Sequence, residues 1–293
     1  MEHGVPEAVE DDAYKIAEEG GIMDVKILKR DENRIRFFVS GVDVSLANSL
    51  RRIMMSEVPS MAIEDVFIIE NSSPMKDEML AHRLGLIPLK TDLDSYVLPS
   101  NCTCNSDLGC SKCSVTLTLE SEAQDNYRTV YSKELKSIDP DVVPVSDQIP
   151  IVKLAQGQKI RLEAYAKLGL GLVNAKWQPT SNCSYTYAAD IKVDRETCTL
   201  CNKCVDACLK HVLALNGGVQ VVDAENCNLC KACEAACPED AIRVDWLQDS
   251  FIFTVESTGV LQPERIFLES IRILKDKASE LTSFIEQLKK GEA

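Results

Sequence analysis

A repeated cysteine pattern constrains the fold of this chain more than any other feature of its sequence. The stretch CTLCNKCVDACLKH spans residues 198–211, and CNLCKACEAACPED spans residues 227–240. Each copy contains Cys-x₂-Cys-x₂-Cys-x₃-Cys, and each cysteine of the second copy follows its counterpart in the first by the same interval, as Cys227 follows Cys198. Clustered Cys-x-x-Cys units in an intracellular protein hold metal more often than they form disulfides. The repeat therefore predicts a small module that folds around metal.

The spacing of this repeat is typical of two [4Fe–4S] clusters. Three thiolates at such spacing surround one corner of an iron–sulfur cube, and in two-cluster ferredoxins the fourth thiolate ligates the opposite cluster. The predicted ligands are Cys198, Cys201, Cys204 and Cys237 for the first cluster, and Cys227, Cys230, Cys233 and Cys208 for the second. Tetrahedral zinc sites are the alternative, but they leave the pseudo-symmetry of the eight cysteines unexplained. Pro238 follows Cys237 as the ferredoxin pattern expects, whereas Leu209 follows Cys208.

A second cysteine group lies in the polar stretch CTCNSDLGCSKC, residues 102–113. It consists of Cys102, Cys104, Cys110 and Cys113. Four thiolates in two close pairs on a short loop suit a tetrahedral Zn²⁺ ion, and a metal-free loop is the alternative. Cys183 stands alone in the sequence, so we expect a free structural thiol there.

Charge and composition exclude several classes of function. The chain carries 46 acidic and 32 basic residues, a net charge of −14. Such a protein is a poor candidate for gripping DNA or an anionic membrane by itself, so any contact with DNA would be indirect. The sequence shows neither a signal-peptide pattern nor an apolar run long enough to span a bilayer, so we expect a cytoplasmic protein with no membrane contact. Acidic residues dominate positions 1–20, which predicts a mobile tail.

Hydrophobic periodicity predicts an α+β protein. Alternation predicts a hairpin, with Met23, Val25 and Ile27 on one face of its first strand and Ile35, Phe37 and Val39 on one face of its second. Residues 43–59 change to helical spacing, with Asp43 or Ser45 as the cap and Ala47, Leu50 and Met54 on one face. Further strands are expected over 63–70, 114–120, 159–169 and 251–257.

The chain ends in a predicted long helix that starts at Pro263. Its apolar residues repeat at heptad a and d positions: Phe267, Ile271, Leu274, Ala278, Leu281, Ile285 and Leu288. A helix that packs on its own sheet explains such a stripe, and so does a helix that packs on a partner. The strict a/d spacing favours a partner, because a helix on a sheet usually has a broader stripe.

Four further stretches resemble one protein family in the order in which they occur. These stretches are NSLRRIMMSEVPSMAIEDV (48–66), LAHRLGLIPL (80–89), NAKWQP (174–179) and FIFTVESTGVLQPERIFLESIRIL (251–274). They are similar to segments of the alpha-like, third-largest subunits of DNA-directed RNA polymerases, and the archaeal members in particular. Some members carry a cysteine loop near 102–113 and an inserted two-cluster ferredoxin-like domain where the repeat lies. Asn174 stands where the family pattern has histidine.

The resemblance implies a domain plan and a role in transcription. The implied domains are an acidic tail over 1–20, a dimerisation domain from 21–60 and 248–293, an insert domain over 61–187 with the cysteine loop 101–113, and a ferredoxin-like domain over 188–247. The family subunit pairs with subunit L and gathers subunits N and P and the large catalytic subunits. It performs no chemistry itself, so no catalytic residues are expected in this chain.

The resemblance also suggests roles for particular residues. Arg51 and Arg52 follow the family's contact with a large subunit, so we expect them to touch a catalytic subunit. The iron–sulfur clusters would act chiefly as structural cross-links, because the small ferredoxin-like domain has only a small core. Loss of the clusters would weaken assembly, which would give redox-linked control of assembly. The alternative function is a ferredoxin-like electron-transfer subunit of a larger redox complex.

Overall fold

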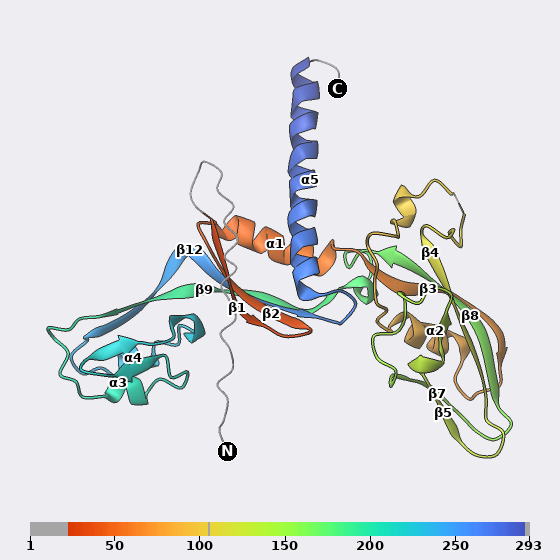
Figure 1. Cartoon of the computed structure of the whole chain (residues 1–293), viewed down its shortest axis with the longest axis horizontal. Helices are drawn as coiled ribbons and strands as arrows, with labels where there is room; N and C mark the ends of the chain where they lie inside the picture. The colour runs from red at the N-terminus through yellow and green to blue at the C-terminus, as the bar shows by residue number, and fades with distance from the viewer. Residues whose placement is uncertain (1–22, 105, 291–293) are drawn as a thin grey trace, which may run out of the picture. The chain divides into compact units, whose positions relative to one another are not determined.

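The computed structural model describes residues 23–104 and 106–290, and its elements confirm the α+β class (Figure 1). The predicted acidic tail 1–20 lies outside the described residues. The chain divides into two compact units, and we describe each by itself. Unit 1 contains residues 1–30, 35–48 and 184–254, and unit 2 contains residues 31–34, 49–183 and 255–293. The three-domain plan implied by the family resemblance divides the chain differently and stays a prediction.

Most of a four-stranded sheet lies in unit 1, with the strand order β1-β2-β12-β9. Its strands are β1 (Asp24–Arg30), β2 (Arg34–Ser40), β9 (Thr180–Val193) and β12 (Ile242–Ser257). The rings of Phe37 and Phe253 stack with their centroids 5.2 Å apart, and Tyr185 packs edge-on against Phe251. These aromatic pairs bury one face of the sheet.

The β1–β2 hairpin confirms one predicted apolar face and corrects the other. Ile35, Phe37 and Val39 are buried as their alternation predicted. In β1, however, Ile27 is 55% exposed and Leu28 is half-buried. Ile27 still pairs in register with the buried Phe37, and the register shift lies beyond it, between Ile27 and Lys29, so Ile27 is left uncovered because β1 is the edge strand of the sheet.

The remainder of unit 1 is a small cysteine-rich module, here called the cysteine module (residues 190–246). It contains α3 (Lys203–Asp206), β10 (Leu213–Leu215), β11 (Val219–Val221), η4 (Ala224–Asn226) and α4 (Ala232–Ala235). Strands β10 and β11 form an antiparallel pair. The buried residues of the module are few and include Cys204, Cys208 and Cys233 beside aliphatic neighbours such as Leu213 and Ile242.

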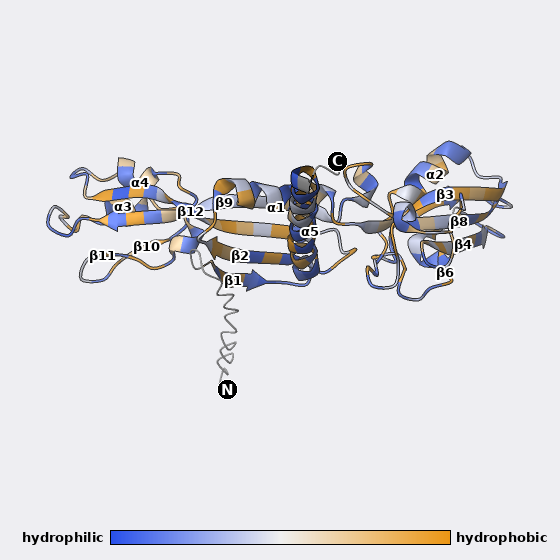
Figure 2. Ribbon diagram, turned by 90° about the horizontal axis from the view of Figure 1, so that it is seen from above, coloured by the Kyte–Doolittle hydropathy of each residue, from blue (hydrophilic) through white to orange (hydrophobic). Residues whose placement is uncertain are grey.

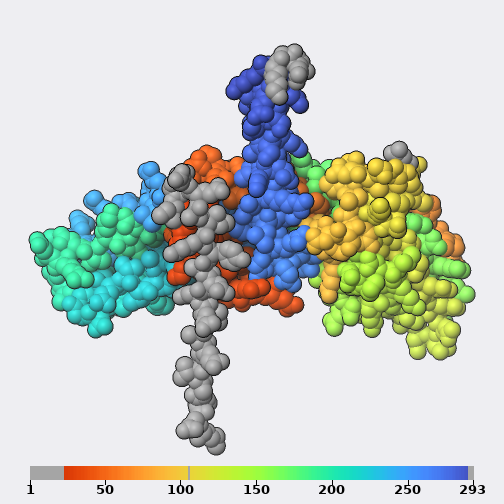
Figure 3. All heavy atoms as spheres, turned by 45° about the horizontal axis from the view of Figure 1, so that its top comes forward, coloured from red at the N-terminus to blue at the C-terminus, as the bar shows by residue number. Residues whose placement is uncertain are grey.

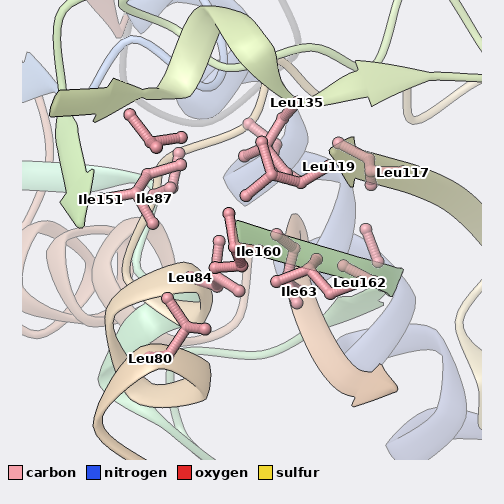
Figure 4. Packing of buried hydrophobic residues seen from close by; sticks show 14 of the residues in the cluster. Ile63, Leu80, Leu84, Ile87, Leu117, Leu119, Leu135, Ile151, Ile160 and Leu162 are labelled. Carbon is pink, nitrogen blue, oxygen red and sulfur yellow. The ribbon is translucent and has the colours of Figure 1, made fainter. Parts of the chain in front are cut away.

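Unit 2 is built on an antiparallel sheet with the strand order β3-β8-β4-β6. These strands are β3 (Ser60–Asn71), β4 (Ser114–Glu122), β6 (Lys136–Ser137) and β8 (Lys159–Gly169), the last with the bounds that the sequence predicted. Unit 2 also contains α2 (Asp77–Gly85), the strand pair β5 (Arg128–Tyr131) with β7 (Pro150–Leu154), and the short turns η1 (Pro99–Asn101), η2 (Ser132–Glu134) and η3 (Ala175–Trp177). Figure 4 shows side chains from these elements packed together, among them Ile63, Leu84, Leu117 and Leu162.

Two longer helices complete the described chain. Helix α1 (Val44–Ser56) buries Ala47, Leu50 and Met54 as predicted. Asp43 is its cap, because the Asp43 Oδ1 atom accepts a hydrogen bond from the Leu46 backbone amide at 2.8 Å. Helix α5 (Pro263–Lys290) confirms the predicted long helix. Among the described residues, no helix combines the length and the apolar composition that crossing a membrane requires.

Candidate metal centres and candidate interface

The four cysteines of the 102–113 loop come together in the structure. Their sulfur atoms all lie within 4.8 Å of one another. The Cys102 and Cys110 sulfurs are 3.7 Å apart, those of Cys104 and Cys113 are 3.7 Å apart, and those of Cys110 and Cys113 are 3.8 Å apart. A zinc ion with four sulfur ligands at about 2.3 Å requires sulfur–sulfur distances of about 3.8 Å. The loop therefore has the dimensions of a tetrahedral zinc site.

Neighbouring groups give two of these thiols different acidities. The backbone amide of Lys112 donates to Cys110 and lowers its pKa to about 7. Burial raises the pKa of the Cys113 thiol to about 12, although the backbone amide of Cys110 also donates to its sulfur at 3.2 Å. Gly109 closes the loop with a φ of 86°, and a side chain there would press against Ser114 and Cys113. The loop is thus shaped so that its sulfurs converge.

The two halves of the cysteine module have the same backbone geometry. Among the described residues, the non-glycine positions with positive φ are Leu200, Asn202 and His211 in the first half and Leu229, Lys231 and Asp240 in the second. Each member of the second set follows its counterpart by the interval that separates the paired cysteines. Hydrogen bonds repeat in the same way: Cys208 N–H donates to the Val205 carbonyl and Cys237 N–H to the Glu234 carbonyl, both at 3.1 Å. Left-handed leucines are rare and strained, so this backbone serves a local requirement in each half.

Two buried thiols of the module have neighbouring thiols from both copies of the repeat. Burial raises the pKa of the Cys204 thiol, and the nearby Cys237 and Cys198 raise it further. Burial likewise raises the pKa of Cys233, with Cys208 and Cys227 as its charged neighbours. Each neighbourhood thus combines cysteines from both copies of the repeat. Cys201 and Cys230 are the exposed members of the two sets. The cluster assignments themselves stay predictions.

Helix α5 changes character along its length. Its first turns contain covered residues, since Pro263, Ile266 and Ser270 are buried. From Lys275 to Lys289 every residue is exposed. The exposed apolar residues in this part are Leu281, Phe284, Ile285 and Leu288, with exposed fractions of 61%, 53%, 43% and 53%. We call these four residues the α5 stripe. Figure 2 shows hydrophobic and hydrophilic residues mixed along α5, and in Figure 3 its last turns rise clear of the other coloured atoms of unit 2.

The remaining members of the predicted heptad differ in their exposure to solvent. Phe267 and Leu274 are half-buried, whereas Ile271 and Ala278 are exposed. The heptad pattern missed Phe284, which is neither an a nor a d residue. It follows Leu281 by three positions, and the helical period is the signal that could have found it.

The two arginines predicted at an interface lie near the C-terminal end of α1. Arg52 is exposed, and Arg51 is half-buried with its Nη1 atom 3.2 Å from the Met55 sulfur. Burial raises the pKa of Cys183 to about 12, an effect that the nearby charge of Arg51 opposes. Cys183 is thus a protonated, buried thiol, which agrees with the structural role expected for it.

The NAKWQP stretch builds part of unit 2. Asn174 caps η3, because its Oδ1 atom accepts a hydrogen bond from the Lys176 amide at 3.0 Å. The Trp177 ring packs where a side chain on Gly169 would lie, and its Nε1 donates to the Lys167 carbonyl at 3.2 Å. Lys176 Nζ lies 4.5 Å from the centre of the Trp177 ring and pairs with Glu64. Asparagine at position 174 therefore has a local structural role.

Comparison with known proteins defines the class of this chain. The family model for the RNA polymerase Rpb3/Rpb11 dimerisation domain matches residues 36–278, so the chain belongs to this family. DNA-directed RNA polymerase subunit Rpo3 of Methanosphaera stadtmanae is 43% identical, and the match covers 90% of this chain and 99% of the relative. The Rpo3 subunit of Methanothermobacter thermautotrophicus gives 43% identity with the same coverage. DNA-directed RNA polymerase II subunit rpb3 of Dictyostelium discoideum is 37% identical, with 88% of this chain and 93% of the relative covered.

Proposed function

We infer that this chain is a non-catalytic assembly subunit of DNA-directed RNA polymerase. Membership of the Rpb3/Rpb11 family supports this function, and so do Rpo3 relatives that match over nine-tenths of the chain. The observation that carries the proposal is the α5 stripe, a row of apolar side chains exposed on the last turns of a helix. A surface of this kind is buried by a partner in the assembled state. The alternative of an electron-transfer subunit has no comparable support.

The partner that we propose for α5 is a subunit of the Rpb11 or L type. The family is defined by a dimerisation domain, and paired helices from two chains would cover the α5 stripe as obligate interfaces cover apolar residues. The wider assembly in this proposal consists of subunits N and P and the large catalytic subunits, with Arg51 and Arg52 as contacts to a large subunit. DNA would be reached only through the complex, in the cytoplasm.

Substitutions on α5 test the dimerisation step. The double variant Leu281→Lys with Ile285→Lys places two charges on the α5 stripe. The matched control is Ser279→Lys with Ser283→Lys, which lies about 160° around the same helix at the same spacing. All four side chains are exposed, so neither variant should destabilise the free chain.

We expect the stripe variant to weaken binding of an L-type partner by roughly 100-fold or more, since it removes two buried apolar contacts. The control should bind like the unmodified chain. Isothermal titration calorimetry with the purified partner measures both affinities. Equal binding by the two double variants would show that the α5 stripe is not the dimerisation surface.

We further propose that the chain holds two [4Fe–4S] clusters and one zinc ion. The crossed thiol neighbourhoods and the repeated backbone of the cysteine module support the clusters. The sulfur–sulfur distances of 3.7–3.8 Å support zinc in the 102–113 loop. Bound iron and zinc would hold together segments that are distant in sequence, so their primary role is structural. Weakened assembly on cluster loss is the regulatory consequence.

Metal analysis of anaerobically purified protein tests these assignments. We expect about eight iron atoms and one zinc ion for each chain. Serine at Cys104 should remove zinc and leave the iron content unchanged. Iron below about four atoms for each chain, or zinc that survives this substitution, would contradict the corresponding site.

A further inference from the structure

The β1–β2 hairpin is fastened to one particular loop of the cysteine module. Arg36 on β2 donates from Nη1 to the Asn226 Oδ1 atom at 2.5 Å and from Nη2 to the backbone carbonyl of Glu225. Lys26 on β1 pairs with the Glu225 carboxylate at 3.3 Å. We call these four residues the hairpin clasp: Lys26, Arg36, Glu225 and Asn226. All of them lie in unit 1.

The clasp continues directly into the ligand set predicted for the second cluster. Asn226 is the last residue of η4 and immediately precedes Cys227. Its Nδ2 atom donates to the Asp223 carboxylate at 2.5 Å, and its backbone amide donates to the same carboxylate at 3.2 Å. The Cys227 amide in turn donates to the Ala224 carbonyl at 3.1 Å. The η4 turn therefore has Arg36 at one side and the Cys227 thiol at its end.

The equivalent turn in the first half of the module has different partners. In the alignment of the two copies, Asp194, Glu196 and Thr197 occupy the positions of Asp223, Glu225 and Asn226. Asp194 accepts a hydrogen bond from the Glu196 amide at 2.9 Å and another from the Thr197 side chain. Thr197 is too short to reach as Asn226 does, and its hydroxyl bonds back to its own turn. The two ligand loops thus share a backbone, but Arg36 and Lys26 bind the second.

We propose that the second iron–sulfur site, and not the first, holds the β1–β2 hairpin in place through Arg36. The inference rests on the proposed function, since it requires clusters on both ligand sets. Iron bound at Cys227, Cys230, Cys233 and Cys208 orders the η4 turn. The ordered turn presents the Glu225 carbonyl and the Asn226 side chain to Arg36 as fixed acceptors.

The hairpin needs such a contact because β1 is an edge strand. β1 pairs with β2 alone, its register is interrupted by a bulge, and Val25 and Leu28 are its half-buried side chains. An edge strand with so little buried surface opens locally more easily than the rest of a sheet. Arg36 makes two charge-assisted hydrogen bonds from a half-buried position and is the stronger part of the clasp. The exposed Lys26–Glu225 pair adds less.

The pseudo-symmetry of the module supplies a matched experiment. Cys201→Ser and Cys230→Ser change exposed ligands that are direct counterparts in the two halves. Hydrogen–deuterium exchange of peptides covering 24–30 is measured on the full chain, purified anaerobically, with iron content determined for every sample. We expect each variant to retain about four iron atoms. Exchange in β1 should rise roughly tenfold in Cys230→Ser and stay unchanged in Cys201→Ser.

Two arginines of β2 complete the test. Arg36→Gln should raise β1 exchange as Cys230→Ser does while the iron content stays at its normal value. Arg34→Gln is the control, because Arg34 is an exposed arginine of the same strand that pairs with Glu256 at 3.6 Å. In the Arg36→Gln background, Cys230→Ser should add no further rise.

The outcomes separate this inference from the proposed function. About four iron atoms in each of the Cys201 and Cys230 variants, together with equal β1 exchange in the two, overturns the role of the second site in holding the hairpin. A further rise when Cys230→Ser is added to Arg36→Gln overturns the path through Arg36. Protein that binds no iron under anaerobic conditions removes the clusters of the proposed function, and the inference with them.

Discussion

Unit 2 and the cysteine module contain cores of very different kinds. In the described part of unit 2, one large buried cluster consists entirely of aliphatic side chains and methionine. In the cysteine module the corresponding cluster is much smaller, and Cys204, Cys208 and Cys233 are among its buried members. The first core can be stabilised by apolar burial alone, at about 25 cal/mol for each Å² removed from water. The second has too few aliphatic side chains for that, which agrees with our proposal that its thiols bind iron.

Iron removal should have the largest effect on folding, and the unfolding that it causes should be confined to the cysteine module. Chelation under denaturant-free conditions is expected to unfold residues 190–246, because the module loses the bonds that join its segments. The core of unit 2 should remain folded. The two tryptophans report on this separately, since Trp246 belongs to unit 1 and Trp177 to unit 2. The Trp246→Phe variant retains Trp177 and reports on unit 2, and the Trp177→Phe variant retains Trp246 and reports on unit 1. A change in Trp177 fluorescence on iron removal would show that unit 2 also depends on iron.

Replacement of a leucine in the core of unit 2 should have the next largest effect on stability. Leu162 on β8 is 1% exposed and lies within the aliphatic cluster. Leu162→Ala should lower the free energy of unfolding of unit 2 by about 2–5 kcal/mol, through lost burial and a cavity. Urea denaturation followed at Trp177 measures this change. The neighbouring exposed residue serves as control, because Arg161→Ala should change the same quantity by less than about 0.5 kcal/mol.

The Asn174 cap of η3 should contribute less to the stability of unit 2 than a core leucine does. Asn174→Ala removes the acceptor for the Lys176 amide and should cost unit 2 about 1 kcal/mol in the same urea experiment. Asn174→Ser keeps an acceptor and should restore most of the loss. An alanine variant as stable as the unmodified chain would mean that the Trp177 contacts alone hold this turn.

Replacement of an exposed leucine in the cysteine module should have the smallest effect on stability. Leu209 stands where the ferredoxin pattern has proline, and its side chain is 88% exposed. Leu209→Ala should change the stability of the iron-loaded module by less than about 0.5 kcal/mol, in contrast to the same substitution at Leu162. Urea unfolding followed at Trp246 tests this. A larger loss would show that Leu209 is covered in the loaded module.

Several elements were predictable because their causes are local. The bounds of β8, the Asp43 cap of α1 and the start of α5 at Pro263 follow from alternation, capping and helical spacing. Helix α2 was missed, although Asp77 and Glu78 in its first turn and the buried pair Leu80 and Leu84 were available signals. The exposure of Ile27 could not be predicted, because it depends on the place of β1 at the edge of its sheet.

By itself, the sequence determined which residues we propose as metal ligands and how the two halves of the cysteine module correspond. Residue type and spacing are local properties, and the repeated stretch folds twice in the same way. Only the tertiary structure decided that four sulfurs of the 102–113 loop meet at 3.7–3.8 Å, and that the last turns of α5 find no cover on their own unit. It also decided that Arg36 lies against the second ligand loop. The position of Arg36 depends on a contact between residues 190 positions apart, and no local pattern encodes which distant segments will meet.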